Sequence, residues 1–204
     1  MIAIVDCGMG NHGSIQNMLL RIGVESTITT DIEVIKAAEK LILPGVGAFD
    51  KAMDNLHRIG IIPTLNEQVL EKKVPILGIC LGMHLFSNKS EEGNTPGLGW
   101  IDAETIKFNF NLAESPLRVP HMGWNTIEVQ QEGSILDNIY DESRFYFVHS
   151  YHVRCQSSAC VLATTDYGIE FHSAIIKDNI VGTQFHPEKS HKFGMKLLSN
   201  FLNS

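Results

Sequence analysis

The segment from Val74 to Phe86 constrains the fold most strongly, because a cysteine flanked by glycines separates two apolar patterns. The run Pro75 to Ile79 is typical of a buried strand, and the stretch Leu81 to Asn88 is compatible with a helix. The pattern G-x-C-x-G between them is the thiol form of the nucleophile elbow, a sharp strand-to-helix turn. Side chains two positions from the nucleophile would collide in such a turn, which explains the glycines.

This turn would place Cys80 at a helix N-terminus, where free N–H groups and the helix dipole favour a thiolate and an oxyanion. A buried structural cysteine gives the same local pattern, since a free cysteine packs like a small hydrophobic residue. The elbow alone therefore leaves both interpretations open. A catalytic cysteine also needs a base and a group that orients the base.

The tripeptide His186-Pro187-Glu188 offers both groups after the last predicted strand. In an extended backbone, residues i and i+2 point to the same side, and a proline biases the preceding residue toward that extended form. Glu188 would then lie beside the His186 imidazole and fix its tautomer, as the carboxylate does in a serine triad. Alone, the tripeptide is more typical of an ordinary turn. Together with the elbow, it predicts a triad of Cys80, His186 and Glu188.

The first half of the chain alternates between strand and helix patterns, which predicts a parallel sheet with helices on both faces. Strands are expected at 1–5, 24–29, 41–43 and 75–79, and helices at 15–22, 32–38, 48–57 and 63–72. Ser14 and Asp31 are the expected N-caps of the first two helices, and Gly23 is expected to close the first. Ligands of such sheets bind at the carboxyl ends of the strands, where Cys80 and the loops 8–11 and 44–47 fall.

The second half changes character and predicts several antiparallel strands, joined by turns at 166–168 and 178–179. These strands are expected at 124–129, 145–154, 161–165, 169–176 and 180–185, before a closing helix at 192–202. The predicted fold is therefore α/β, with a mixed, mostly parallel central sheet, helices on both faces and a smaller antiparallel strand set. A length of 204 residues favours a single domain, 1–204.

Composition excludes several classes of function. The net charge is -7 and no block of basic residues occurs, so a nucleic-acid partner has no electrostatic support. No apolar run reaches the roughly 20 residues of a membrane helix. The N-terminus lacks a signal-peptide pattern and the four cysteines form no C-x-x-C, which favours a reducing, cytoplasmic location. No metal or organic cofactor is expected, and four histidines without metal-ligand spacing are taken as strand or surface residues: His149, His152, His172 and His191.

Two motifs, Gly78 to Met83 and Gln184 to Glu188, resemble the class I (triad) glutamine amidotransferases. Three further motifs narrow this resemblance to the HisH-type glutaminase subunits of imidazole glycerol phosphate synthase. They are Pro44 to Phe49, His121 to Asn125 and Tyr146 to Tyr151. These motifs occur in the family's order and span nearly the whole chain, from the loop 8–11 to Ser190.

The resemblance implies hydrolysis of L-glutamine to glutamate and ammonia through a glutamyl thioester on Cys80. His186 would transfer the thiol proton to the leaving ammonia. The oxyanion needs backbone N–H donors: elbow geometry offers Leu81, and the family match adds Val46. Gly45 and Gly47 flank Val46, would let its peptide change orientation, and are expected to contribute to the substrate site.

The resemblance also assigns glutamine contacts to the backbone of Ser150 and Tyr151. The family usually carries a glutamine four residues after the nucleophile, whereas this chain has His84. This departure weakens the expectation that the residue at position 84 contacts the glutamine substrate. His84 is either a substrate contact or a histidine on the helix surface, and the sequence leaves the two open.

Free ammonia is protonated in neutral water, so a glutaminase of this kind delivers it through a closed interface. The family's partner is a (β/α)₈ barrel cyclase of histidine biosynthesis, which implies a heterodimer. By resemblance, its interface would include Asn11, Trp124, Tyr146 and Lys189. Ordinary packing explains Trp124 or Tyr146 equally well when each is considered alone.

Three alternatives to the histidine pathway remain. Paralogous subunits supply ammonia to a sugar amidotransferase that builds amidino sugars for surface polysaccharide, and His84 with the segment Ser190 to Met195 resembles those somewhat more. A non-catalytic regulatory subunit would share the fold, but the intact triad residues argue against it. A free-standing thiol hydrolase acting on γ-glutamyl peptides would need a more open pocket.

Overall fold

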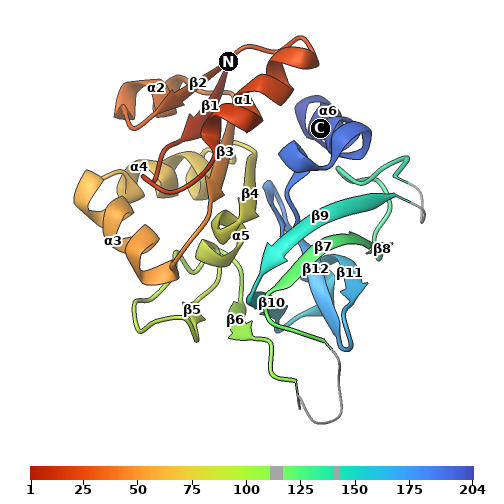
Figure 1. Ribbon diagram of the computed structural model, residues 1–204. Helices are drawn as coiled ribbons and strands as arrows, with labels where there is room; N and C mark the ends of the chain where they lie inside the picture. The colour runs from red at the N-terminus through yellow and green to blue at the C-terminus, as the bar shows by residue number, and fades with distance from the viewer. Residues whose placement is uncertain (111–116, 140–142) are drawn as a thin grey trace.

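The computed structural model describes residues 1–110, 117–139 and 143–204. A mixed sheet with the strand order β2-β1-β3-β4-β13-β12-β10-β6-β5 forms its centre, and β11 joins this sheet by pairing with β12 and β8 (Figure 1). The strands β7 and β9 form a separate antiparallel ribbon. The α/β fold with a mixed sheet and an additional antiparallel strand set is therefore confirmed.

Five neighbouring strands make the parallel part of the sheet. They are β2 (Ser26–Thr29), β1 (Ile2–Val5), β3 (Lys40–Gly45), β4 (Ile76–Cys80) and β13 (Ile180–Thr183). Every residue of β1, β4 and β13 is buried, because helices cover both faces of a parallel sheet. Alternate side chains serve the two layers: Leu41 and Leu43 face one core, and Ile42 faces the other.

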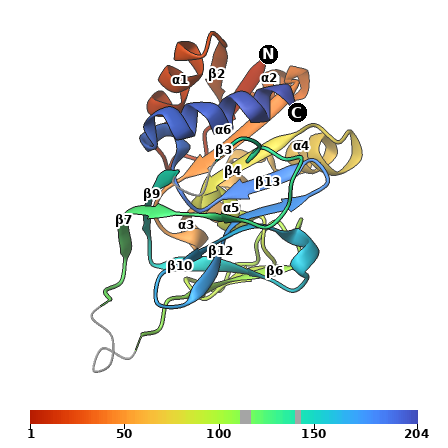
Figure 2. The same cartoon turned by 90° about the vertical axis from the view of Figure 1, so that its right-hand side faces the viewer.

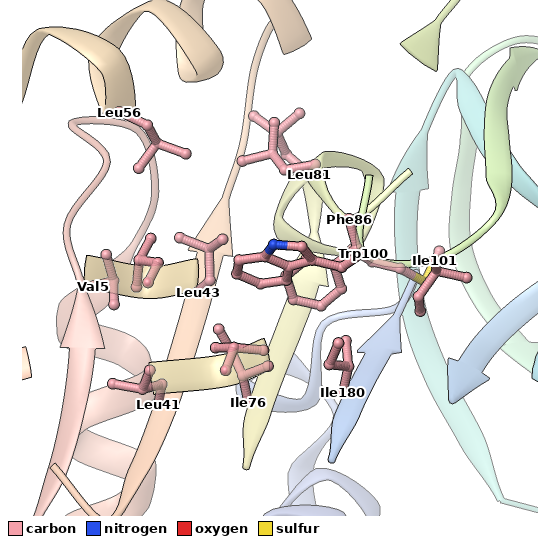
Figure 3. Close-up of a cluster of buried hydrophobic side chains, with 14 of the residues drawn as sticks. Val5, Leu41, Leu43, Leu56, Ile76, Leu81, Phe86, Trp100, Ile101 and Ile180 are labelled. Atoms are coloured by element: carbon pink, nitrogen blue, oxygen red, sulfur yellow. The ribbon is translucent and has the colours of Figure 1, made fainter. Parts of the chain in front are cut away.

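The helices divide between the two faces. One face is covered by α1 (His12–Arg21) and α6 (His191–Asn203), which pack against each other (Figure 2). The other face is covered by α2 (Ile32–Ala37), α3 (Phe49–Ile59), α4 (Ile62–Asn66) with the π-helical turn Glu67–Glu71, and α5 (Leu81–Leu85). Trp100 fills the core beneath this second layer and stacks on Phe86 with ring centroids 5.1 Å apart (Figure 3).

No helix among the described residues has both the length and the apolar character needed to cross a bilayer.

Antiparallel strands continue the sheet beyond β13. They are β12 (Glu170–Lys177), β10 (Tyr151–Cys155), β6 (Ala103–Lys107), β11 (Val161–Asp166) and the short edge strand β8 (Glu128–Val129). At the other edge, the short strand β5 (Lys89–Ser90) runs parallel to β6. The ribbon pairs β7 (His121–Thr126) with β9 (Arg144–His149). Strand β6 was not expected, because Ala, Glu and Lys have low strand propensity. Short 3₁₀ turns follow at Ser158–Cys160 and Pro187–Lys189.

Two predicted strands are each divided in two. The segment 145–154 was expected to be continuous, but it changes partners at Ser150: β9 pairs with β7, whereas β10 pairs with β6 and β12. The segment 124–129 likewise separates into β7 and β8. The alternation of burial breaks at this point, because Ser150 and Tyr151 are both partly exposed and His152 and Val153 are both buried. The sequence itself shows no turn residue such as glycine or proline there, so it predicts one continuous strand.

Two smaller expectations about local structure are wrong. The first helix begins at His12, and its N-cap is Asn11, whose side chain accepts a hydrogen bond from the Ser14 N–H at 3.3 Å. Asn and Ser cap helices about equally well, so the sequence does not decide between them. Strand β3 continues through Pro44 instead of ending before it. β3 pairs with β1 only as far as Ile42, and beyond that residue it pairs only with β4. Pro44 has no N–H to donate, but no hydrogen bond to β1 is needed at this position.

Candidate active site

Cys80 occupies the elbow between β4 and α5 in the conformation that the sequence predicts. Its backbone has φ 53° and ψ -107°, a strained region for a residue with a side chain. The packing accounts for both glycines, because a Cβ at Gly82 would overlap the Leu43 carbonyl and one at Gly78 would overlap the Phe86 ring. The strained turn therefore presents the sulfur at the carboxyl edge of the parallel strands.

His186 and Glu188 form the second part of the site. Nδ1 of His186 lies 2.8 Å from Oε1 of Glu188, and the two side chains are 2% and 4% exposed. His186 is extended, as predicted, but Pro187–Lys189 forms a 3₁₀ turn, so the turn brings Glu188 to the ring and not the alternation of an extended strand. The backbone of His186 is also fixed, because its N–H donates to the Tyr146 carbonyl at 2.9 Å and its carbonyl accepts from Ser190 Oγ at 2.6 Å.

The protonation of His186 depends on two opposing influences. Burial lowers the pKa of the imidazole, but the neighbouring Cys80 sulfur and Glu188 carboxylate outweigh burial and raise the pKa well above 6.5. Its Nε2 atom is buried and has no hydrogen-bond partner in the described part of the chain. With Nδ1 held by Glu188, Nε2 is the ring nitrogen available for a thiol proton.

A cavity of about 450 Å³ opens over the elbow. Its walls include seven of the predicted site residues: Cys80, Leu81, Val46, Gly47, His84, Ser150 and Tyr151. Gly45 does not line this cavity. It lies opposite Cys80 in the β3–β4 pair, and a Cβ there would approach Leu81 to 3.0 Å. Gly45 therefore allows close packing beside the cavity, and its expected contribution to the substrate site remains a prediction.

The two residues that are expected to donate to the oxyanion both line the cavity with Cys80. Leu81 is the first residue of α5, and the N–H groups at a helix start have no acceptor within the helix. Val46 follows Gly45, the strand partner of Cys80, and is 43% exposed at the cavity. Gly47 has φ +105°, and a Cβ there would overlap the Met9 side chain. The loop thus depends on a glycine at this position, while the donor roles remain predictions.

His84 is buried and 4% exposed, so its interpretation as a helix-surface histidine is wrong. Its Nε2 lies 2.8 Å from Oε1 of Gln184, and Nε2 of Gln184 lies 3.7 Å from the Cys80 sulfur. Burial lowers the pKa of His84 to about 4, although the hydrogen bond to Gln184 opposes this shift. His84 also lines the cavity, so the expectation of a substrate contact remains open.

The cavity contains residues that the sequence analysis did not single out, notably Glu92, Pro120 and His149. Oε2 of Glu92 accepts a hydrogen bond from the Phe49 N–H at the start of α3, at 3.0 Å. Burial is the main cause that raises the pKa of this carboxyl group. Glu91 and Glu92 are adjacent in a loop, and no spacing in the sequence distinguishes the one that faces the cavity.

A chain of neutral imidazoles lies behind the cavity, where the sequence suggested unremarkable strand histidines. Nδ1 of His149 lies 2.8 Å from the Tyr151 carbonyl oxygen and must donate to it. Nε2 of His149 then accepts from Nδ1 of His121 at 3.0 Å. Burial lowers the pKa of His121 to about 4 and that of His149 well below 6.5. These neutral rings anchor the backbone of Tyr151, a predicted substrate contact.

The predicted interface residues lie close together. Trp124 pairs with Tyr146 across the ribbon, with ring centroids 6.0 Å apart, and Lys189 Nζ lies 5.3 Å from the Tyr146 ring centroid. Trp124 is 45% exposed, so core packing does not explain it, and His191 stacks on it at 5.4 Å. Asn11 begins α1, a helix that packs against the turn Pro187–Lys189. The interface itself remains a prediction.

Metal chemistry receives no support from the described residues, which contain no group of three His, Cys, Asp or Glu side chains placed to hold an ion. The four cysteines are free thiols: Cys7, Cys80, Cys155 and Cys160. The arrangement at the elbow is instead suited to nucleophilic chemistry, because it combines a thiol, a buried imidazole–carboxylate pair and a cavity.

Comparison with known proteins agrees with this chemistry. Residues 3–204 match the family described as "Glutamine amidotransferase class-I". Over 202 residues the chain is 55% identical to "Imidazole glycerol phosphate synthase subunit HisH 2" of Methanococcus maripaludis, covering 99% of this chain and 98% of the relative. It is 48% identical to the protein of the same name from Pseudomonas aeruginosa, again over 99% of this chain and 98% of that protein.

Solved structures share the fold at lower identity. A structure described as "Crystal structure of glutamine amidotransferase" superposes with a TM-score of 0.75 at 20% identity, covering 99% of this chain and 97% of that one. A glutamine amidotransferase from Thermotoga maritima gives a TM-score of 0.64 at 14% identity, covering 99% of this chain and 82% of that one. These likenesses establish the architecture of the sheet and helices.

Proposed function

Because the chain belongs to the class-I glutamine amidotransferase family, we propose that Cys80, His186 and Glu188 hydrolyse L-glutamine to glutamate and ammonia. The observation that carries this proposal is the buried 2.8 Å contact between His186 and Glu188 beside a cavity that contains Cys80. A raised His186 pKa is suited to receiving a proton from a thiol. We also propose that the chain acts as a single domain, 1–204, in the cytoplasm.

The proposed reaction starts from a thiolate–imidazolium pair, in which the Cys80 proton has already passed to Nε2 of His186. The thiolate attacks the side-chain amide carbon of glutamine, and the N–H groups of Leu81 and Val46 stabilise the oxyanion. The C–N bond then breaks, and His186 returns the proton to the leaving nitrogen, which departs as ammonia. Water, deprotonated by His186, attacks the thioester; the C–S bond breaks, glutamate leaves and the thiolate–imidazolium pair is restored.

The cavity offers groups that fit the rest of glutamine. Its volume of about 450 Å³ lies within the range typical of small-ligand sites. We propose that the Glu92 carboxylate pairs with the α-ammonium group and that backbone groups of Ser150 and Tyr151 hold the main-chain end; the three residues line the cavity, which supports these roles.

The ammonia, we propose, passes to a (β/α)₈ barrel cyclase that forms a heterodimer with this chain and makes imidazole glycerol phosphate for histidine biosynthesis. The names of the relatives support this assignment, since each is a subunit of imidazole glycerol phosphate synthase. The exposed surface around Trp124, Tyr146 and Lys189 is the proposed docking site. Because the Tyr146 carbonyl holds the His186 N–H, docking on β9 would act directly on the base.

A second candidate partner is a sugar amidotransferase of surface-polysaccharide synthesis. One observation favours it: His191, in the segment that resembles those paralogues, stacks on Trp124 at the proposed docking site. His191 also has φ +48°, so the helix start holds this ring in place at some cost in backbone strain. The two candidates share the glutaminase chemistry and differ in the acceptor of the ammonia.

The test is glutamate release from glutamine by the purified chain, alone and with each candidate partner. Cys80→Ala should lower the rate by about 10⁴-fold or more, because it removes the nucleophile. The matched control Cys160→Ala removes a different free thiol and should leave the rate unchanged. The partner whose own ligand accelerates glutamate release identifies the pathway. Equal rates for wild type and Cys80→Ala would contradict the proposal.

A further inference from the structure

The Cys80 sulfur has a second buried neighbour besides the proposed base. Gln184 is fully buried at the end of β13, and its backbone N–H donates to the Ser173 carbonyl at 2.9 Å. Its side-chain amide bridges two groups: Oε1 lies 2.8 Å from His84 Nε2, and Nε2 lies 3.7 Å from the sulfur. A buried amide with two protein partners has a defined position, and one of its partners here is the nucleophile.

We propose that Gln184 donates an N–H hydrogen bond to the Cys80 sulfur and that His84 orients the Gln184 amide for this contact. Gln184 is thereby a catalytic residue that touches the reacting atom, and His84 is a positioning residue that acts through Gln184. This inference rests on the proposed function, in which Cys80 is the nucleophile, and adds a group that selects its reactive form.

The tautomer of His84 sets the direction of this hydrogen-bond chain. An amide oxygen only accepts, so His84 Nε2 must carry a proton to bond Gln184 Oε1. Turning the amide over would require the other His84 tautomer and would place Oε1, which has no proton to donate, against the sulfur. The titratable groups near His84 are His149 and His152, and both stay neutral because burial lowers their pKa values. The amide nitrogen therefore faces the sulfur.

This nitrogen distinguishes the thiolate from the thiol. The protonated thiol has an acceptor in the Val148 carbonyl oxygen at 4.0 Å, but a thiolate carries no proton to donate to it. An N–H group aimed at the sulfur interacts more strongly with the charged form, and a hydrogen bond to the charged form favours ionisation. The Gln184 contact thus increases the thiolate fraction before glutamine binds.

The experiment measures alkylation of Cys80 by iodoacetamide as a function of pH in the full chain, with mass spectrometry of the Cys80 peptide to separate it from the other thiols. Gln184→Met keeps the approximate shape but lacks the N–H donor. It should raise the pH of half-maximal alkylation by about one unit, which is a tenfold lower thiolate fraction near neutral pH.

The His84 variants test the positioning role in the same assay. His84→Phe removes the proton that holds Gln184 Oε1 and should shift the profile in the same direction as Gln184→Met. His84→Gln restores an N–H donor and should return the profile close to wild type. His172→Phe is the matched control, because this histidine bonds the Cys155 N–H at 3.1 Å, away from the elbow, and should have no effect.

Two results would overturn the inference. The first is a wild-type alkylation profile in both Gln184→Met and His84→Phe, with an increased KM for glutamine, because this pattern assigns the pair to substrate binding alone. The second is a failure of His84→Gln to restore the profile while urea unfolding shows it to be folded. If Gln184→Met does not fold, the two His84 variants decide. Alkylation needs no turnover, so it separates failure of this inference from failure of the proposed function.

Discussion

Buried imidazoles occur in two regions around Cys80, and the regions differ in their electrostatics. His186 lies against Glu188, and its pKa is raised although burial alone would lower it. The second region, which we call the neutral histidine group, consists of His84, His121, His149 and His152. Burial lowers the pKa of each of these four residues. Both regions are shielded from water, so exposure does not explain the difference.

The difference follows from the carboxylate. A buried imidazole can ionise only if negative groups compensate the loss of hydration. Cys80 and Glu188 both do so for His186, and Glu188 is the carboxylate in direct contact with the ring. The neutral histidine group has amide, carbonyl and imidazole partners instead, which suit an uncharged ring. Proximity to a cysteine therefore does not identify a catalytic base in this molecule. The paired carboxylate does.

The largest effect on activity is expected when the carboxylate that contacts His186 is replaced by a neutral group. Glu188→Gln should lower kcat/KM for glutamine hydrolysis by about 10³–10⁴-fold, because a neutral amide neither stabilises the imidazolium nor enforces its tautomer. The pKa of His186 should fall in parallel. Steady-state glutamate release in the presence of the partner measures this change. The exposed Glu71→Gln is the control, and a loss of less than tenfold at Glu188 would break the comparison.

The neutral histidine group should make the fold sensitive to acid. His84 titrates near 6.5 when unfolded and at about 4 when folded. Between these values the unfolded chain binds more protons, so stability is complete above pH 6.5 and falls as the pH decreases. His84 alone should remove on the order of 3 kcal/mol of unfolding free energy by pH 4.

Urea unfolding at several pH values measures this loss. The His186–Glu188 pair cannot cause it, since a raised pKa stabilises the fold at low pH and loses that contribution only as pH rises through the folded-state value. Unfolding free energies that stay constant between pH 6.5 and 5 would contradict the assignment of neutral buried rings.

The smallest expected effect concerns His152. Neither of its ring nitrogens has a hydrogen-bond partner within the described ranges, and its ring packs 4.7 Å from that of Phe108. His152→Phe keeps an aromatic ring and removes two buried polar atoms, so it should stabilise the fold by about 1 kcal/mol at pH 7. Thermal unfolding should show a rise of about 2–4 °C. A clear destabilisation would mean that the His152 ring makes a polar interaction that stabilises the fold, which would contradict its placement among the neutral rings.

The sequence predicts the parallel half of the sheet and the elbow well, because both depend on local patterns. Apolar runs that end in glycine-rich loops define the strands. Gly78 and Gly82 are required because Phe86 and Leu43 pack too closely against them for a side chain to fit. The neighbouring position of His186 and Glu188 was also predictable, although a 3₁₀ turn and not an extended strand produces it.

Other features depend on contacts between distant segments. The division of one predicted strand at Ser150 arises from pairing partners elsewhere in the chain. The burial of His84 depends on Gln184, one hundred positions later. Glu92 faces the cavity because the start of α3 bonds its carboxylate. The spacing of hydrophobic residues along the sequence does not reveal such contacts. They include the contacts that distinguish the neutral histidine group from His186.

The most direct test of this account is an NMR titration of the histidine side-chain nitrogens, with assignments from single substitutions. We expect His186 to be still an imidazolium at pH 7.5, whereas His84, His121, His149 and His152 should remain neutral down to about pH 5. A His186 that titrates at or below 6.5, or a neutral histidine group that titrates near 6.5, would contradict the claim that Glu188 selects the base.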